Sequence, residues 1–186
     1  MTNASNDNHL FRPNSYIGRT VPRPNAKRLL NGRGNYTDDT KLPRMVHVAF
    51  LRSPYAHARI NKIDKNQATK APGVVAVVDG HDLAEVCAPW VGVLAHLEGM
   101  KSAEQHALAI KKASWEGEPV VAIVASTRAL AEDALELINV EWDILPVVTD
   151  MEAALGEDAE VIHESLGDNL AWRRTMDAGD VGASFD

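Results

Sequence analysis

The sequence predicts an α/β protein in which helices pack on a mixed sheet. The main observation is a strand–helix–strand pattern with short connections between Glu116 and Val148. Residues 120–125 form a continuous apolar run rich in β-branched side chains, which is typical of a strand buried on both faces. Residues 127–138 then place apolar side chains three and four apart, and residues 140–144 alternate apolar with acidic side chains. Such a unit predicts a parallel or mixed sheet with the helix on one face.

Length and composition agree with this class. The 186 residues suffice for one domain with a long arm, and 45% apolar with 5% aromatic residues suits a soluble α/β protein. No apolar run reaches the roughly 18 residues that span a bilayer, and the polar start is not a secretory signal, so no membrane partner is expected and the cytoplasm is the predicted compartment. The single cysteine, Cys87, excludes an internal disulfide and is too few for an iron–sulfur cluster or a structural zinc site.

Charge divides the chain into a basic and an acidic part. Residues 1–70 hold 13 Lys and Arg against 4 Asp and Glu, whereas residues 71–186 hold 6 against 22. A basic arm could bind nucleic acid, but it has few aromatic residues for stacking and the acidic remainder would repel phosphate. The preferred interpretation is an arm that docks on an acidic surface of its own chain or of a partner, with no nucleic acid bound.

The chain before the first strand is predicted to be irregular. Residues 1–15 are expected to be a disordered tail and residues 16–44 an extended basic arm with proline and glycine turns. Gly32-Arg33-Gly34 resembles the start of a dinucleotide-binding fingerprint. Position 37 is threonine and no strand precedes the motif, so we do not expect it to bind phosphate.

The following elements are predicted from local patterns, and residues 88–114 show no clear periodicity. Before residue 88, the predicted elements are a strand over 45–51, a strand over 58–63, a short helix over 65–69 capped by Asp64, a strand over 74–78, and a short helix through 81–84 opened by Asp79 or Gly80. After residue 148, they are a capped helical turn after Asp150, an extended segment over 159–163 and a loop over 167–177. A first helical turn over 181–185, capped by Asp180, is predicted last.

Residues capable of chemistry form no complete site in the sequence. None of the seven histidines has a partner four residues away, the spacing that places two imidazoles on one helical face for a metal. His57 is read as a hydrogen-bonded anchor in a turn, with a catalytic base as the alternative, and His81 with Asp82 lies at a helix start.

The nucleophile and acid–base patterns are equally incomplete. No serine stands in a GxSxG frame, and Cys87 is expected to be a buried structural thiol because its acidic neighbour disfavours a thiolate. The pairs Glu116/Glu118 and Glu141/Asp143 could each supply an acid and a base, although solvated strand edges are the preferred interpretation. No catalytic, cofactor-binding or metal-binding residue is therefore assigned.

Five blocks nevertheless occur in a recognisable order. They are LLNGRGNYTDD (29–39), LPRMVHVAFLRSPYAHARI (42–60), APGVVAVVDGHDL (71–83), EGEPVVAIVASTRALAEDALELINVEWDILPVVTDMEAAL (116–155) and GDVGASFD (179–186). Over residues 16–186 the chain resembles the N-terminal region of the large, molybdenum-binding subunit of the xanthine dehydrogenase and aldehyde oxidase family, and bacterial carbon monoxide dehydrogenase large subunits are similar in style. Two departures from that family are Arg44, where glycine usually follows LP, and Pro24-Asn25-Ala26, which replaces a commoner acidic pair.

The resemblance implies an α/β hammerhead domain over 45–155, preceded by the arm and followed by a connecting segment over 156–186 to downstream molybdenum-binding domains or a downstream chain. It implies a hydroxylase that adds oxygen from water at a molybdenum held by a molybdopterin cytosine dinucleotide, with an iron–sulfur subunit and a flavin subunit as partners. The family's catalytic and pterin-gripping residues lie in later domains, so the chain alone is expected to bind no cofactor and to be inactive. The alternative is a stand-alone, non-enzymatic assembly or binding module.

Overall fold

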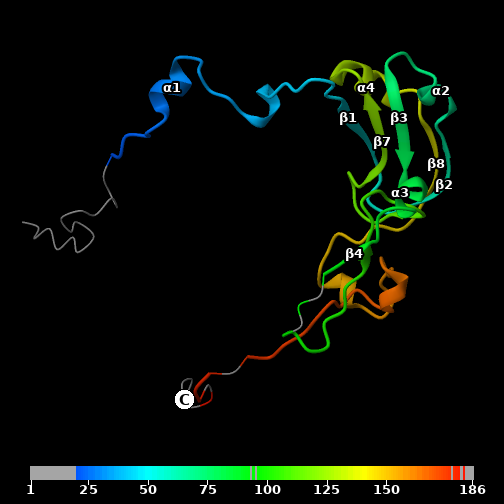
Figure 1. The fold of residues 1–186 in the computed structure, drawn as a ribbon. Helices are drawn as coiled ribbons and strands as arrows, with labels where there is room; N and C mark the ends of the chain where they lie inside the picture. Colours follow the sequence, from blue (N-terminus) through cyan, green and yellow to red (C-terminus); the bar gives the residue numbers. More distant parts are fainter. Residues whose placement is uncertain (1–19, 93, 95, 177, 181, 183–186) are drawn as a thin grey trace, which may run out of the picture. The chain divides into compact units, whose positions relative to one another are not determined.

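The computed structural model of the chain describes residues 20–92, 94, 96–176, 178–180 and 182 (Figure 1). The chain divides into two compact units, one ending at Arg44 and the other beginning at Met45. Two predictions fall outside the described residues: the disordered tail over 1–15, and the helical turn over 181–185 except for Gly182.

The first unit contains a short helix that the sequence did not predict. This helix, α1 (Ala26–Leu30), carries Lys27 and Arg28 in its last turn, where positive charge complements the helix dipole. A second short element, the 3₁₀ helix η1 (Thr37–Asp39), begins after Tyr36, whose backbone N–H donates to Asp39 Oδ2 at 3.0 Å. The predicted extended arm is therefore partly helical.

Arg44, at the end of this unit, is the one non-glycine residue with a positive φ (61°) in the described part of the chain. A side chain with a Cβ is disfavoured in this left-handed conformation by about 1 kcal/mol, whereas glycine adopts it freely. We expect Arg44→Gly to raise the free energy of unfolding by up to about 1 kcal/mol in urea denaturation. The control is Lys41→Gly, at an exposed position with ordinary φ, which should lower stability; a loss in both variants would contradict the prediction.

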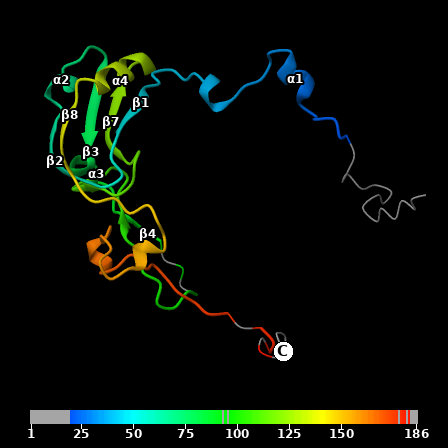
Figure 2. The ribbon, with the colours of Figure 1, turned by 180° about the vertical axis from the view of Figure 1, so that it is seen from behind.

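The second unit is built around two three-stranded sheets in which every described strand pair is antiparallel. In spatial order, sheet A consists of β1 (His47–Arg52), β7 (Pro119–Ala125) and β3 (Val74–Asp79), and sheet B of β6 (Lys112–Ala113), β2 (Ala58–Asp64) and β8 (Asn139–Ile144). β2 and β8 run beside each other next to β3 in both views of the molecule (Figures 1 and 2). Strands β1, β2 and β3 confirm three of the predicted strands.

The strand–helix–strand pattern is present, but its predicted topology is wrong. The helix α4 (Arg128–Leu135) begins after Thr127, whose side-chain oxygen accepts the Leu130 N–H at 3.2 Å. The strands on either side of α4 belong to different sheets, so they form no parallel crossover. The physical reason is that β1 and β3 already pair with both edges of β7, and β8 therefore pairs with β2.

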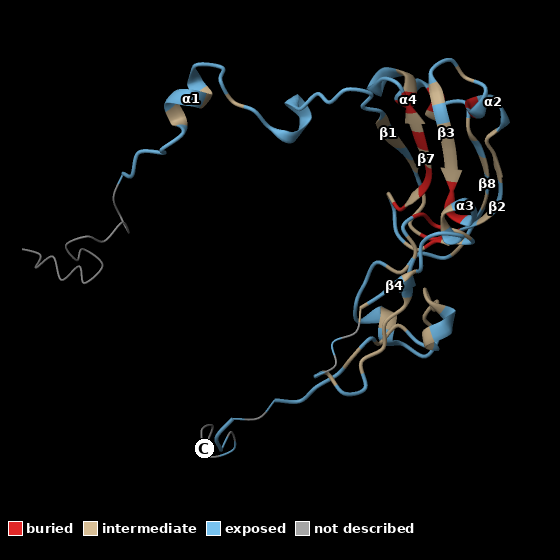
Figure 3. Ribbon diagram, viewed as in Figure 1, coloured by how far each residue is buried: buried red, intermediate tan, exposed pale blue. Residues whose placement is uncertain are grey.

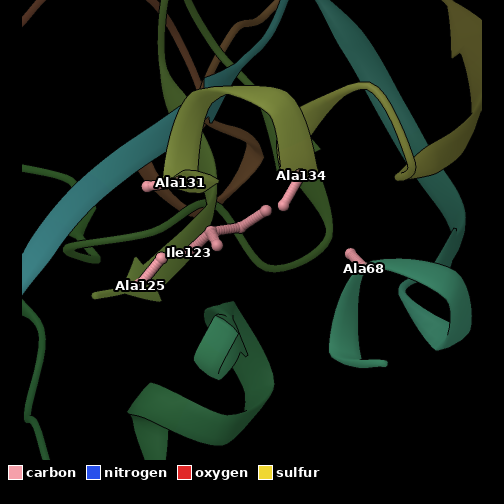
Figure 4. Packing of buried hydrophobic residues seen from close by; sticks show 5 residues of the cluster. All are labelled: Ala68, Ile123, Ala125, Ala131 and Ala134. Atoms are coloured by element: carbon pink, nitrogen blue, oxygen red, sulfur yellow. The ribbon is translucent and has the colours of Figure 1, made fainter. Parts of the chain in front are cut away.

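The core lies on one face of sheet A. Ala131 and Ala134 of α4 pack against Ile123 and Ala125 of β7, and Ala68 completes the cluster (Figure 4). The two buried helix residues are alanines, and Leu130 and Leu135 of α4 pack against the same cluster. The central strand carries most of the buried positions of sheet A (Figure 3).

A second cluster joins the two sheets. Val120 and Val121 of β7, with Ala109, pack against three partly buried side chains of sheet B: Ile60, Ile63 and Trp142. Val121 and Ile123 are both fully buried and share one face of β7, so α4 and sheet B cover the same face of sheet A.

Two short helices are fixed by one ionic cluster. α2 (Asn66–Thr69) follows Lys65, and α3 (Gly80–Ala84) is capped by Asp79, whose carboxylate accepts the N–H groups of His81 and Asp82. Lys65 Nζ bridges Asp79 Oδ2 at 2.7 Å and also binds Asp82. Burial acts to raise the pKa of Asp79, but hydrogen bonds from Lys65 and from the Asp82 backbone outweigh it and hold the pKa below its ordinary value.

The remaining short elements lie in the part of the unit that contains residues 88–106 and 150–172. They are the hairpin strands β4 (Trp90–Val91) and β5 (Glu104–Gln105) and the 3₁₀ helices η2 (Ala153–Leu155) and η3 (Glu164–Leu166). The helical turn predicted after Asp150 is confirmed as η2, and Asp150 Oδ1 accepts the N–H groups of Glu152 and Ala153. Among the described residues, no helix is both long and apolar enough to cross a bilayer.

Within the second unit, the stretch 159–172 is fixed by several hydrogen bonds and an ion pair. The Asn169 amide accepts the Ile162 N–H at 3.0 Å and donates to the carbonyl oxygens of Ala154 and Glu160. Lys101 forms an ion pair with Asp168, and the Trp172 indole N–H donates to the Glu98 carbonyl oxygen at 3.2 Å. This stretch is therefore folded, although it has almost no regular secondary structure.

Candidate functional site

A concave site of the second unit lies beside β6 and the turn that leads into β7. It is a cavity of about 270 Å³ lined by acidic, basic and imidazole side chains together with Trp115. The lining residues are 104–106, 109–112, 114, 115, 118 and 163. Three titratable groups of the lining have shifted pKa values or ion-pair partners: Glu118, Lys112 and His163.

Glu118 is a buried carboxylate, only 7% exposed, at the entry to β7. Its Oε2 accepts the Ser114 N–H at 2.6 Å, and the Trp115 backbone N–H is a second donor. Burial raises the pKa of Glu118 above its ordinary value, although both backbone donors act in the opposite direction. The predicted solvated edge is therefore wrong for Glu118, and it holds for Glu116, which is exposed.

Substitutions at Glu118 separate its role as a hydrogen-bond acceptor from the effect of its charge. We expect Glu118→Ala to lower the free energy of unfolding by about 2 kcal/mol, because two backbone N–H groups lose their acceptor. Glu118→Gln should change it by less than about 1 kcal/mol at pH 7, since an amide oxygen accepts the same bonds without a buried charge. Urea denaturation of the purified chain measures both, and equal losses in the two variants would contradict this assignment.

The raised pKa of Glu118 also determines the direction in which its contribution to stability changes with pH. Between its unfolded and folded pKa values, Glu118 binds more protons in the folded state, so it contributes stability at low pH that is lost as the pH rises through the folded pKa. Relative to Glu118→Gln, the wild-type chain should gain stability as the pH falls from 7 toward the ordinary value of 4.5. Taking this difference cancels the opposite contribution of other carboxyl groups such as Asp79, whose pKa is lowered. A difference that is constant with pH would refute the assignment.

Lys112 and His163 line the same cavity from segments far apart in the sequence. Lys112 Nζ bonds the Ile162 carbonyl oxygen and Glu164 Oε2, the latter at 2.8 Å. Burial, reinforced by the positive charge of Lys112, lowers the pKa of His163 and favours the neutral imidazole. The hydrogen bond from Lys112 lowers the pKa of Glu164.

The sequence did not identify Lys112 and His163 as neighbours, because no local pattern marks either residue. The lysine lies in the stretch 88–114, which has no periodicity, and its partners are 50 and 52 residues away. A buried acid, a neutral imidazole and a lysine are groups used in proton transfer, but Glu118 and Lys112 already bond to the chain itself. The main role of this arrangement is therefore structural. Glu118 fixes the turn before β7, and Lys112 links β6 to η3.

His57 is an anchor, as the sequence predicted. Its ring is 2% exposed, and its Nδ1 lies 2.8 Å from the Pro146 carbonyl oxygen. The Leu145 N–H donates to the His57 carbonyl oxygen at 3.0 Å, so the residue joins the turn before β2 to the end of β8. Its Nε2 is buried without a hydrogen-bond partner among the described residues.

The two most distinctive sequence blocks, RSPYAHARI and GEPVVAIVA, meet at one end of sheet A. The backbone N–H of Ser53 donates to the Glu118 carbonyl oxygen, and the Gly117 N–H donates to the Ser53 carbonyl oxygen, both at 2.9 Å. Arg52 Nη1 donates to the Gly117 carbonyl oxygen at 2.9 Å, and Gly117 supplies the positive φ of 85° that this tight turn requires. The two blocks therefore form a single structural joint.

The other candidates do not assemble into a site. Glu141 and Asp143 are exposed, as predicted, and Glu141 pairs with Lys62 at 3.6 Å. Asp82 is confirmed as part of a helix start. Cys87 is exposed, so the predicted buried thiol is wrong: α3 ends at Ala84, and the chain leaves the core before position 87.

The described residues do not fit a resident metal. No group of three or more His, Cys, Asp or Glu side chains among them is arranged to hold an ion.

Comparison with known proteins gives a consistent assignment. Residues 31–146 match the family described as aldehyde oxidase and xanthine dehydrogenase, a/b hammerhead domain. The chain is 37% identical over 182 residues to the nicotine 6-hydroxylase large subunit of Paenarthrobacter nicotinovorans, covering 95% of this chain and 22% of that protein. It is 42% identical over 148 residues to the carbon monoxide dehydrogenase large chain of Hydrogenophaga pseudoflava, covering 78% of this chain and 18% of that one.

A solved structure extends the match to three dimensions. Quinoline 2-oxidoreductase from Pseudomonas putida 86 superposes with a TM-score of 0.75 at 45% identity, covering 83% of this chain and 20% of that chain. The present chain thus spans about a fifth of the length of these relatives. The resemblance and the α/β hammerhead class inferred from the sequence are confirmed. The chain belongs to the aldehyde oxidase and xanthine dehydrogenase family and corresponds to the N-terminal, hammerhead-bearing part of its large subunits.

Proposed function

We propose that the chain is the hammerhead scaffold of the large subunit of a molybdenum hydroxylase, an oxidoreductase that adds water-derived oxygen to its substrate. The observation that carries this proposal is the family match over 31–146, together with 37–42% identity to large subunits of two such enzymes. The contribution of these residues is structural. Two antiparallel sheets and α4 form a core, and the joint between Ser53 and Gly117 fixes one end of it.

We further propose that the complete enzyme holds a molybdopterin cytosine dinucleotide whose contacts come from outside these 186 residues. When bound, this group supplies the redox-active metal at which the substrate is oxidised. The described part of the chain has no cluster of metal-ligating side chains, which supports placing the ligands elsewhere. On this proposal the chain contributes no catalytic residue, and alone it is inactive.

An iron–sulfur subunit and a flavin subunit are the proposed redox partners. The single cysteine supports this arrangement, because one thiolate cannot hold a cluster that needs four. The relatives act, by their names, on nicotine, carbon monoxide and quinoline, yet they share this domain. We therefore also place the residues that select the substrate outside the chain.

Purification from the native source tests the proposal. The chain is tagged at its genomic copy, isolated with whatever polypeptide accompanies or continues it, and assayed for molybdenum, iron and flavin. We expect all three in the isolated protein. The 186-residue chain produced alone should contain no molybdenum and should reduce no dye with purines, aldehydes or carbon monoxide.

Two outcomes would overturn the proposal in different ways. If the native preparation lacks molybdenum, the chain is instead a stand-alone binding module. If the short chain alone carries stoichiometric molybdenum, the metal ligands lie within it, and the scaffold assignment is wrong.

A further inference from the structure

Across two rows of paired residues, one face of sheet A carries only apolar side chains. The antiparallel register aligns Val48, Val124 and Ala76 in one cross-strand row, because Val124 pairs with both of the others. In the same way Phe50, Ala122 and Val78 form a second row on the same face. We call these six residues the open face.

The described part of the chain covers the open face only in part. None of its six residues belongs to either core cluster, and Val48 and Phe50 are 50% and 43% exposed. On the opposite face, Ile123 and Val121 are fully buried. In an antiparallel sheet with one face in water, the side chains of that face are usually polar. A face made of valine, alanine and phenylalanine is therefore suited to burial against another surface.

The border of the open face carries a positive charge. The Arg52 guanidinium lies 5.7 Å from the centroid of the Phe50 ring, and its Nη1 is held by the Gly117 carbonyl oxygen. Arg52 has no ion pair with any described residue. Arginine and aromatic side chains are enriched among the residues that contribute most to binding at interfaces, and this guanidinium beside an apolar surface favours a partner with a carboxylate.

The size of the face distinguishes between possible partners. A stable dimer buries roughly 800 Å² on each partner, and six mostly half-buried side chains offer far less. A partner in the same subunit needs less area, because covalent connection removes most of the entropy cost of association. The matched relatives are about five times longer than this chain, since it covers 18–22% of them.

We propose that the open face is the docking surface for the remainder of the large subunit, which meets it with an apolar surface and a carboxylate opposite Arg52. This inference rests on the proposed function, because it assumes that the chain is part of such a subunit. It assigns the hammerhead sheet a second role: one face closes its own core, and the other positions this domain on the rest of the subunit.

Hydroxyl-radical footprinting of the assembled protein, isolated from the native source, tests the inference. We expect the Phe50 ring to be oxidised about ten-fold more slowly than the ring introduced by the control Ala129→Phe, because a covered ring is protected from solvent. Ala129 is exposed on α4, the helix that covers the opposite face of sheet A. Equal oxidation of the two rings would overturn the proposal.

A pair of charge variants provides the second measurement. In the assembled protein, Phe50→Asp should lower the yield of intact subunit and expose the domain to proteolysis, whereas Ala129→Asp on the exposed side of α4 should leave both unchanged. If Phe50 is protected equally in the chain produced alone, and that chain dimerises in sedimentation, a second copy covers the face and the assigned partner is wrong.

Metal analysis of the same preparation separates this inference from the proposed function. If the Phe50 ring is protected in a preparation without molybdenum, the open face is a docking surface and the molybdenum assignment is wrong. If instead the preparation contains molybdenum and the Phe50 ring is oxidised as fast as the control ring, the proposed function stands and the docking surface is wrong.

Discussion

Ile123→Ala is expected to lower the free energy of unfolding by about 3 kcal/mol, the largest loss we predict for a single truncation in this chain. Ile123 is fully buried in the central strand β7, and it is among the largest side chains to be so. It packs in one cluster with Ala131 and Ala134 of α4, which are too small to fill the space it would leave (Figure 4). The substitution therefore removes apolar contacts and leaves a cavity that the helix cannot close.

The measurement is urea denaturation of the purified chain, with Val75→Ala as the control. Val75 is 65% exposed on the neighbouring strand, so its truncation should change stability by less than about 0.5 kcal/mol. If Ile123→Ala cost no more than this control, the packing of α4 on sheet A would be wrong.

Gly80→Ala is expected to cost about 2 kcal/mol or more, although alanine is a better helix former than glycine and Gly80 begins α3. A Cβ at this position would lie 2.5 Å from the Ala109 carbonyl oxygen and 2.9 Å from Ile110 Cγ1. The first of these atoms belongs to the backbone and cannot rotate away. Residue 109 is itself fixed, because its N–H donates to the Pro119 carbonyl oxygen at 2.8 Å.

Gly156, where an added Cβ meets one close neighbour at a longer distance, gives the matched comparison. Gly156 has a φ of −68°, and its nearest neighbour to an added Cβ is the Ala153 carbonyl oxygen at 3.2 Å. We expect Gly156→Ala to stay within about 0.5 kcal/mol of the wild-type chain in urea denaturation. A stabilising effect of Gly80→Ala would show that helix propensity outweighs the close approach of residue 109.

The sequence predicted local elements well and their assembly less well. Residues 47–52, 58–64 and 74–79 are strands as expected, since alternation and turn residues are local signals. The partner of β8 was not predictable in this way: β2 lies about 80 residues earlier, and the strand–helix–strand pattern is equally compatible with a parallel neighbour.

The candidate site was less predictable still. The pair Glu116/Glu118 has the spacing of two residues on one side of a strand, yet one is exposed and the other is buried, because the turn at Gly117 precedes β7. His57 was identified correctly from its place in a turn, whereas its partner Pro146 is 89 residues away. Partners at such separations are determined by tertiary packing, which carries no local signature.

The division of β7 and β8 between two sheets has a consequence for synthesis on the ribosome. Sheet A needs only residues 47–125, so it is complete once β7 has emerged. Sheet B waits for residues 139–144, and until then one edge of β2 has no neighbour. A nascent chain that has emerged as far as the segment between Ala125 and Asn139 would therefore present a finished first sheet beside a strand with one unpaired edge, the stage at which a chaperone is most useful to it.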